Sequence, residues 1–553
     1  MGSDDFRKSG GLVNGKRQTT RSAAKRAAQP TVDHREPWPE QAASFVEFFV
    51  FLLVLKSFFL PLFIIPTGSM AATLYGEHAI NTCPNCGMEY AVGWQKPANW
   101  PQGRRFHPVS VQCPNCRWQQ YFDFGHPHAL RAKGLAQSEI LSNPLRSSPG
   151  DRIFVHGWNY APILDGIGDV GPQRWDVVVF KVPRDGQTNY IKRLLGLPGE
   201  QLEFINGDLF VNDQIARKTA DAQRSLWFPY YNHDYPPQEP SLRAGYHPRW
   251  VALDSDSQWA GLHSRVPRFD GTDAPRGEIQ FATQPGDPTR EPGRIEDTYA
   301  YNGIWKTPKQ VTDVCLSAEL CIEDGDGYVE FSTTKYDDRF FARLSGDGHL
   351  TLERQRLGQA APNEPELLGQ AQIAKAGTPV KIALSNVDYQ VSVMVNGEAA
   401  IVSTPEQYAI TVAEARRLVD RVSTPQIRVA CERVRATVRH LAIERDVYYT
   451  ADPDRGSNRP ANAGTGHPLT LKPTEYFCCG DNSPNSLDGR YWYEDTLGPH
   501  LQADCRAEAY TVGTVPADQL IGHAFFVYWP GFMPLTSGGP NLLPDLGRAR
   551  WIR

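Results

Sequence analysis

The chain has 553 residues, which is enough for several domains. Its apolar fraction of 41% and charged fraction of 22% are ordinary for globular protein, and a net charge of −5 gives no case for a nucleic-acid partner. Plentiful glycine (47) and proline (44) favour turn-rich structure, so we expect a mainly β fold.

An apolar segment dominates the N-terminal region. Residues 45–65 are apolar on all sides with only Glu47 and Lys56 charged, close to the roughly 20 residues that a bilayer crossing needs. We predict an uncleaved transmembrane anchor over 42–65 rather than a core helix or a cleaved signal peptide, because the run is long, starts late and lacks a cleavage site.

The charge on either side of this segment predicts its orientation. Residues 1–40 hold eight basic residues and 66–95 hold none, so the positive-inside rule places the N-terminus in the cytoplasm and the rest of the chain outside. Residues 1–41, rich in Arg, Ala, Ser, Gln and Gly, predict a disordered basic tail.

A serine follows directly on the apolar segment. Gly68 before Ser69 suits a strained turn that exposes a nucleophile. The Thr67 hydroxyl and the Ser69 backbone N–H are candidate donors to an oxyanion. A serine hydroxyl needs a base to become a nucleophile, and no histidine stands in or beside this block.

Four cysteines cluster in the segment 77–149. They form two C-P-N-C knuckles, with the residues Cys83, Cys86, Cys113 and Cys116. This spacing predicts a zinc-ribbon-like insert with a closed, structural Zn site. Two disulfides are the main alternative, since the segment faces an oxidising compartment. A redox C-x-x-C is less favoured because no βαβ context surrounds it.

The candidate base is a lysine on a predicted strand over 189–195. Alternation places Tyr190, Lys192 and Leu194 on one face and Arg193 on the other. Only about one solvated lysine in 2,500 is neutral at pH 7, so a base at this position has to be desolvated. The alternative is an ordinary exposed strand lysine.

A second insert is predicted over 221–450. Short alternating runs such as 327–331 and 389–397 are separated by Gly, Asp and Asn turns, which is typical of β strands. Residues 380–397 resemble the back-sheet strands of a concanavalin/laminin-G-like sandwich. Such a sandwich binds glycans or proteins, or is a purely structural insertion, and we leave these alternatives open.

A polar loop over 480–492 supplies the last candidate residues. Ser486 is a candidate to hydrogen-bond and orient the lysine. Asp481, Asp488 and Arg490 are close enough in sequence to form a salt-bridged loop, with Arg193 as a further partner. The alternative is a solvated turn. Residues 536–553 are expected to be a C-terminal tail.

Together these blocks resemble the type I signal peptidases, the membrane-anchored Ser/Lys endopeptidases of peptidase family S26. The resemblance is carried, in chain order, by residues 65–74, 150–155, 174–180, 190–200, 202–212, 480–492 and 521–524. It implies a discontinuous, mainly antiparallel β catalytic domain from 66–76, 150–220 and 451–535, lying on the outer face of the bacterial plasma membrane.

The resemblance also implies the chemistry. Ser69 would be the nucleophile, Lys192 the general base, Thr67 part of the oxyanion hole and Ser486 the residue that holds the lysine. No catalytic cofactor is implied. The reaction implied is removal of signal peptides from preproteins after small residues, with the lipid bilayer and the secretion translocon as partners.

Departures from the family pattern leave the substrate preference open; they are Thr67, Ala72, Trp175, Gly489 and His523. None removes the Ser/Lys pair. Two other functions therefore stay under consideration. One is a non-catalytic membrane adaptor that displays the zinc-ribbon-like and lectin-like inserts. The other is a Ser/Lys peptidase that trims a narrow set of envelope proteins.

Overall fold

The computed structural model describes most of the chain. The described residues are 38–54, 56, 60–94, 110–122, 140–141, 145, 147–157, 171–237, 249–254, 257–273, 276–282, 294–303, 308–358, 364–373, 377–453, 458–534 and 541–552. The predicted tail over 1–41 lies outside them except for its last four residues. Two units, 1–54 and 55–553, are described separately.

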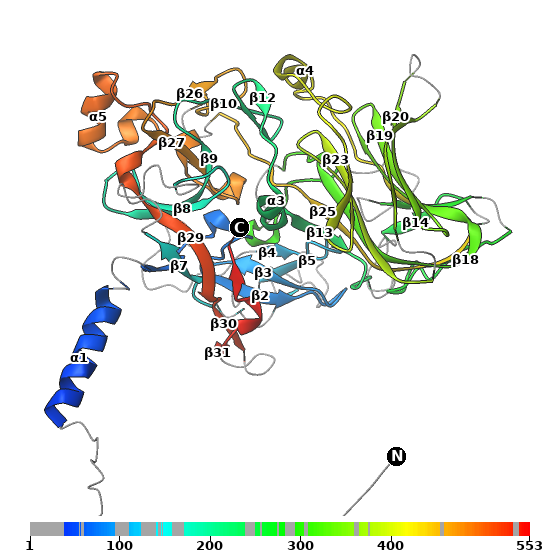
Figure 1. Ribbon diagram of the computed structural model, residues 1–553, viewed down its shortest axis with the longest axis horizontal. Coiled ribbons are helices and arrows are strands. Elements are labelled where there is room, and N and C mark those ends of the chain that lie inside the picture. Colours follow the sequence, from blue (N-terminus) through cyan, green and yellow to red (C-terminus); the bar gives the residue numbers. More distant parts are fainter. Residues whose placement is uncertain are drawn as a thin grey trace, which may run out of the picture. The chain divides into compact units, whose positions relative to one another are not determined.

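The first unit contains the helix α1 (Trp38–Val54; Figure 1). Its 17 residues are largely apolar. Its large side chains are exposed, as with Phe45 at 69%. The prediction of one span over 42–65 is wrong at its C-terminal end, because Leu62–Ile64 forms strand β1 and pairs with β7 (Arg152–His156). No helix among the described residues combines the length and apolar character that a bilayer crossing requires.

The second unit is built from several β-sheets, and the prediction of a mainly β fold is confirmed. An eight-stranded sheet has the order β1-β7-β29-β8-β9-β27-β28, with β32 beside β29. Its remaining strands are β29 (Leu520–Trp529), β8 (Val177–Lys181), β9 (Asn189–Gly196), β27 (Glu475–Cys479), β28 (Val515–Pro516) and β32 (Arg550–Trp551). Since β32 joins this sheet, the C-terminal segment extends the domain rather than trailing from it.

Strand β9 lies inside this sheet, between β8 and β27. Lys192 stands opposite Val178 of β8. A buried apolar cluster that includes Phe180 and Leu194 covers one face of the sheet. After β9 the chain enters a four-stranded sheet, whose fourth strand comes from a distant part of the sequence. The strands are β10 (Gln201–Ile205), β11 (Asp208–Val211), β12 (Gln214–Ile215) and β26 (Leu469–Thr470).

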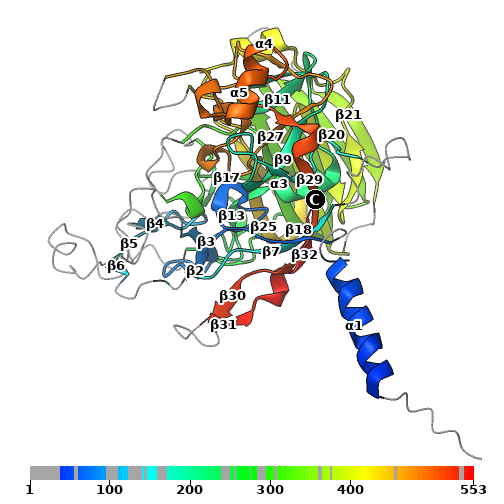
Figure 2. The same ribbon diagram turned by 90° about the vertical axis from the view of Figure 1, so that its left-hand side faces the viewer.

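Two small sheets surround the cysteine knuckles (Figure 2). One pairs β2 (His78–Thr82) with β3 (Glu89–Gly93), and the other contains β4 (Ser110–Gln112), β5 (Gln119–Phe122) and β6 (Ile140–Leu141). The four cysteines, Trp118 and Val92 form one buried cluster between them. A further hairpin joins β30 (Phe532–Pro534) to β31 (Asn541–Pro544).

The largest sheet, with thirteen strands, forms the sandwich. Two long strands, β18 (Val314–Lys335) and β25 (Ile427–Arg445), pair along most of their length and are shared by both of its layers. Three register irregularities interrupt their pairing, and such bulges bend a strand from one layer into the other. The first half of β18 pairs with β22 and the second half with β19.

The other sandwich strands pair with these two or with one another (Figure 1). They are β13 (Phe228–Asn232), β14 (Trp250–Ala252), β15 (Trp259–Ala260), β16 (Arg268–Asp270), β17 (Gly277–Phe281), β19 (Asp338–Ser345), β20 (His349–Arg356), β21 (Glu366–Gln372), β22 (Val380–Val387), β23 (Gln390–Val395) and β24 (Glu398–Val402). One continuous apolar core fills the space between the layers.

The helices of the second unit are short. They are the α-helices α3 (Ala220–Leu226), α4 (Val412–Arg417) and α5 (Pro499–Arg506), and the 3-10 turns η2 (Gly68–Met70), η7 (Ala300–Asn302), η8 (Ser483–Asn485), η9 (Gly489–Tyr491), η10 (Glu494–Thr496), η11 (Ala517–Gln519) and η12 (Leu546–Arg548). Turn η2 contacts both β9 and η8, which brings three distant parts of the sequence to one site.

Candidate active site and metal centre

The structure brings the predicted serine and lysine into direct contact. Ser69 lies in turn η2 and Lys192 on strand β9, and the Lys192 Nζ donates a hydrogen bond to the Ser69 Oγ over 2.7 Å. A second bond runs from the same Nζ to the Ile191 carbonyl over 3.0 Å. A pair at this distance can exchange a proton directly.

The lysine side chain is buried. Only 4% of its surface is exposed, and the Tyr190 ring lies 5.2 Å from its amine. Desolvation lowers the pKa of Lys192 from 10.5 to about 8, although the carboxylates of Asp488 and Asp481 oppose the shift. The alternative of a solvated strand lysine therefore does not describe this residue.

The turn that carries the serine is held from two sides. The Asn482 N–H donates to the Ser69 carbonyl (3.0 Å), and the Asn482 side-chain Nδ2 donates to the Gly68 carbonyl (2.8 Å). On the other side, a Cβ at Gly68 would lie 2.0 Å from the Tyr301 ring. Glycine is therefore needed at 68 because the tyrosine leaves no space for a side chain.

Two buried ion pairs support the loop over 480–492. Arg193 binds Asp481 through Nε–Oδ1 and Nη2–Oδ2 contacts of 2.8 Å each, and both side chains are fully buried. Arg490 binds Asp488 in the same way over 2.8 and 2.6 Å. Burial alone would raise the pKa of Asp488, but the Arg490 guanidinium overcomes it and the pKa is lowered. The loop is thus a buried, paired structure and not a solvated turn.

Ser486 makes a different contact from the one expected, whereas the oxyanion role of Thr67 stays a prediction. Thr67 is exposed, and its hydroxyl makes no hydrogen bond within the described residues. Ser486 Oγ is buried and, among the described residues, does not bond to Lys192; it acts instead on the Asp488 carboxylate, whose pKa it helps to lower. A Cβ at Gly480 would lie 2.4 Å from both Ser486 Oγ and the Ser69 carbonyl, which shows how closely Ser486 approaches the serine turn.

Sequence reasoning missed three residues of this site. Asn482 anchors the serine turn, and it exchanges hydrogen bonds of 2.6 and 2.7 Å with Asn302. Tyr301 packs on Gly68 and donates to the Glu77 carbonyl (3.0 Å). Asn302 and Tyr301 belong to the predicted insert 221–450, and no local pattern marks them.

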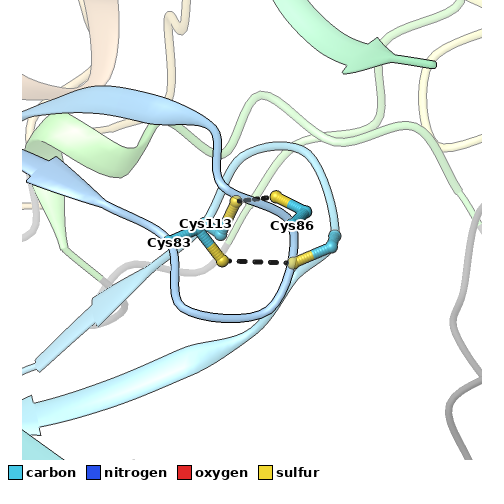
Figure 3. A group of neighbouring side chains, drawn as sticks. Cys83, Cys86 and Cys113 are labelled. Carbon is cyan, nitrogen blue, oxygen red and sulfur yellow. Dashed lines mark hydrogen bonds between the residues drawn. The ribbon is translucent and has the colours of Figure 1, made fainter. Parts of the chain in front are cut away.

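The four cysteines converge as a compact group (Figure 3). All four are buried free thiols, and their sulfurs lie within 4.8 Å of one another, with 3.5 Å between Cys83 and Cys116 and 3.7 Å between Cys86 and Cys113. Zn–S bonds of about 2.3 Å place tetrahedral ligand sulfurs about 3.8 Å apart. The donor set and its spacing fit a metal ion, so this group can bind one.

The two knuckles are built alike. In each, the N–H of the residue after the second cysteine donates to the first cysteine's carbonyl: Gly87 to Cys83 over 2.9 Å and Arg117 to Cys113 over 3.1 Å. Both of these residues have positive φ. Each tight turn brings its two sulfurs to the same side, which is what a four-ligand site needs.

Comparison with known proteins connects this site to a family. The family model described as signal peptidase, peptidase S26, matches residues 141–242 and 382–529. These ranges include Lys192, Arg193 and the loop over 480–492, whereas the serine block at 65–74 lies outside them. The chain is therefore similar to that family over the lysine strand and its supporting loop.

Individual relatives match a shorter part. Signal peptidase I of Pseudomonas fluorescens is 40% identical over 83 residues, which cover 13% of this chain and 28% of that protein. Signal peptidase I of Rickettsia massiliae (strain Mtu5) is 44% identical over 63 residues, covering 11% of this chain and 24% of the relative. The chain thus spans about a quarter of the length of the curated relatives it matches.

Solved structures are similar to the chain in fold alone. The carbohydrate-binding module CBM66 from Bacillus subtilis matches with 9% identity and a TM-score of 0.22, covering 35% of this chain and 95% of the module. A Bacillus subtilis protein with a galectin-like fold matches with 8% identity and a TM-score of 0.24, covering 39% and 97%. At such scores the similarity carries no argument about ligands.

Proposed function

We propose that this chain is a serine endopeptidase that removes N-terminal signal peptides from exported preproteins. The observation that carries the proposal is the 2.7 Å contact between Lys192 Nζ and Ser69 Oγ in a buried site. The similarity to signal peptidase I and the family-model match across Lys192 support the substrate class. The narrow-specificity envelope peptidase is the second candidate, and it shares the same chemistry.

In the proposed reaction, the neutral Lys192 amine accepts the proton of Ser69 Oγ as that oxygen attacks the scissile carbonyl carbon. The Thr67 hydroxyl donates to the oxyanion that forms. The Lys192 ammonium then gives its proton to the leaving amine nitrogen, which leaves an ester on Ser69. A water molecule, deprotonated by the same amine, attacks the ester carbon. The bond from that carbon to Ser69 Oγ breaks, the Lys192 ammonium returns its proton to Oγ, and the signal peptide leaves with a free C-terminal carboxyl group.

The non-catalytic adaptor is less consistent with this geometry. A scaffold that only displays binding domains has no need to keep a lysine desolvated beside a serine hydroxyl, since burying an amine is unfavourable. It also has no need for two buried ion pairs behind the serine turn.

Loss of the nucleophile provides the test. We expect Ser69→Ala to abolish cleavage of a model preprotein by detergent-solubilised full-length protein, with mass spectrometry of the wild-type products placing the cut after a small residue. Ser264→Ala, at a sandwich turn where Ser264 Oγ donates to the Gly261 carbonyl, is the control and keeps full activity. Undiminished cleavage by Ser69→Ala would contradict the assignment.

We also propose that α1 attaches the protein to the bacterial plasma membrane. Exposed apolar side chains on one 17-residue helix support this. Replacing Phe48, Phe49 and Leu52 by serine is expected to reduce co-flotation of the protein with phospholipid vesicles. The matched control is serine at three exposed apolar residues of the sandwich, Leu357, Leu367 and Val402. Equal flotation of both variants would remove α1 as the attachment.

A further inference from the structure

The second cysteine knuckle docks on the sandwich. Asn115, between its two cysteines, donates from Nδ2 to the Tyr235 carbonyl and accepts from the Asn232 N–H, each over 2.7 Å. Arg117, directly after Cys116, lies with its guanidinium carbon 4.2 Å from the centroid of the Tyr230 ring. The cysteine group therefore lies at an interface between two inserts that are far apart in the sequence.

A buried arginine of the sandwich stands close to this interface without a partner. Arg249 is 1% exposed, and none of its three guanidinium nitrogens has a hydrogen-bond partner among the described residues. Its guanidinium carbon lies over the rings of Phe281 (4.8 Å) and Tyr231 (5.8 Å). Burial lowers the pKa of Arg249, which reflects how poorly its charge is stabilised by these surroundings.

The Phe281 ring connects Arg249 to the second knuckle, because it lies under Arg249 and 6.2 Å from the Tyr230 ring on which Arg117 stacks. Among the described residues, the strongest electrostatic influences on Arg249 come from Tyr230, Arg117, Tyr231 and Cys116. Among these, only the Cys116 sulfur becomes an anion readily, and it does so when it binds a metal. An unpaired buried arginine is unfavourable, and native proteins pair such charges. The missing partner of Arg249 is therefore to be sought at the cysteine group.

The charge of the cysteine group depends on its chemical state. Four thiols, or two disulfides, are neutral and leave Arg249 unbalanced. Four thiolates around a divalent cation carry a net double negative charge, which two guanidinium groups would balance. Arg117 is the second such group: its Nη2 is buried without a hydrogen-bond partner, while its Nη1 donates to Thr298 Oγ1 over 3.2 Å. Arg117 also interacts with Glu296, so the inference is carried by Arg249.

We propose that Arg249 is the counter-ion of a dianionic metal–tetrathiolate centre, a divalent cation such as Zn²⁺ held by Cys83, Cys86, Cys113 and Cys116, and that metal loading fastens the sandwich to the cysteine knuckles. This inference does not depend on the proposed peptidase activity. It favours metal over disulfides, the alternative that the cysteine spacing left open.

The centre is also linked to the serine turn. The segment 294–303 connects the two: Thr298 accepts from Arg117, and three residues further along Tyr301 lies against Gly93 at the end of β3 and against Gly68. Metal loading thus acts on the same segment that packs beside Ser69. Arg249 is a positioning residue in this arrangement, and it touches no reacting atom.

Removing the charge of Arg249 tests the proposal, because the change should be unfavourable in the metal-loaded protein and favourable in the metal-free protein. In the full-length protein, Arg249→Met is expected to lower Zn²⁺ affinity by about 10- to 100-fold in chelator competition, the usual effect of losing an outer-shell partner. In chelator-treated protein the same change should raise the thermal midpoint, because an unpaired buried charge is removed. Arg249→Lys keeps the charge and should retain most of the affinity.

Arg354→Met is the matched control. Arg354 is a largely buried arginine of the same sandwich, paired with Asp338 over 2.9 Å, and its loss should leave Zn²⁺ affinity unchanged. Equal Zn²⁺ affinity of wild type and Arg249→Met would overturn the proposal, as would isolation of metal-free protein with two disulfides at the quartet.

A measurement on the wild-type protein covers the case in which Arg249→Met does not fold. Removing Zn²⁺ with a chelator under reducing conditions should lower amide-exchange protection in β13 and in 294–303, the two segments that contact the second knuckle. Unchanged protection there would show that metal does not fasten the interface, and the proposal would fail.

Discussion

Replacing Lys192 by methionine is expected to lower kcat by about 10²- to 10⁴-fold, the range that a positioned general base contributes. Methionine fills nearly the same volume and prefers the same buried surroundings, so the fold should be kept. Only the group that accepts the Ser69 proton over 2.7 Å is lost. Cleavage of a model preprotein by detergent-solubilised wild-type and variant protein measures the effect.

The same lysine should control the pH dependence. A base has to be neutral to accept a proton, so kcat/KM should rise as the pH increases through about 8, the value to which burial lowers the pKa of Lys192. With this pKa about one amine in ten is neutral at pH 7, against about one in 2,500 for a solvated lysine. The burial of Lys192 thus produces most of the neutral amine that can act as a base at pH 7.

Lys181 provides the control for this experiment. It lies on the neighbouring strand β8, and its Nζ donates to the Gln187 carbonyl at the protein surface. Lys181→Met should change neither the rate nor the pH profile. A profile for wild-type protein that is flat between pH 6 and about 9 would contradict a lysine base, since a titrating base must change the rate near its own pKa.

Local sequence patterns, such as the alternation of side chains along a strand, predicted the arrangement around Lys192 well. The alternation of a strand put Tyr190 and Lys192 on one face and Arg193 on the other, because successive side chains point to opposite sides. In the structure Tyr190 lies beside the lysine amine, and Arg193 turns away to Asp481. The spacing of the cysteine knuckles likewise indicated a four-sulfur group, because tight turns fix where their side chains point.

Contacts between distant segments were not predictable in this way. Asn302 bonds to Asn482, which lies 180 residues later in the chain, and Tyr301 lies against Gly68, which precedes the insert 221–450 altogether. No periodicity in the sequence reports such a contact. The prediction of a single span over the apolar segment 45–65 failed for a different reason. Hydropathy does not distinguish a short apolar strand from a helix, so it did not reveal that Leu62–Ile64 belongs to the eight-stranded sheet.

The buried pair of Arg193 and Asp481 is expected to give the largest loss of stability. Arg193→Met leaves the Asp481 carboxylate buried with Thr73 Oγ1 still donating to it over 2.6 Å but without its guanidinium. Breaking one side of such a pair costs about 3–5 kcal/mol. Activity should fall as well, because Asn482, the next residue, holds the carbonyl of Ser69. Urea unfolding followed by tryptophan fluorescence measures the first effect and the preprotein assay the second.

A double variant distinguishes the cost of losing the ion pair from the cost of leaving one buried charge unpaired. Arg193→Met with Asp481→Leu removes both charges, so it should recover much of the stability that Arg193→Met loses, since replacing a buried ion pair by apolar groups is often close to neutral. Arg224→Met breaks an exposed pair with Asp221, whose side chains are 57% and 67% exposed, and should cost less than about 1 kcal/mol. If Arg193→Met cost no more than Arg224→Met, the loop over 480–492 would be held by its other contacts. The buried pair of Arg490 and Asp488 would then be the one that fixes the serine turn.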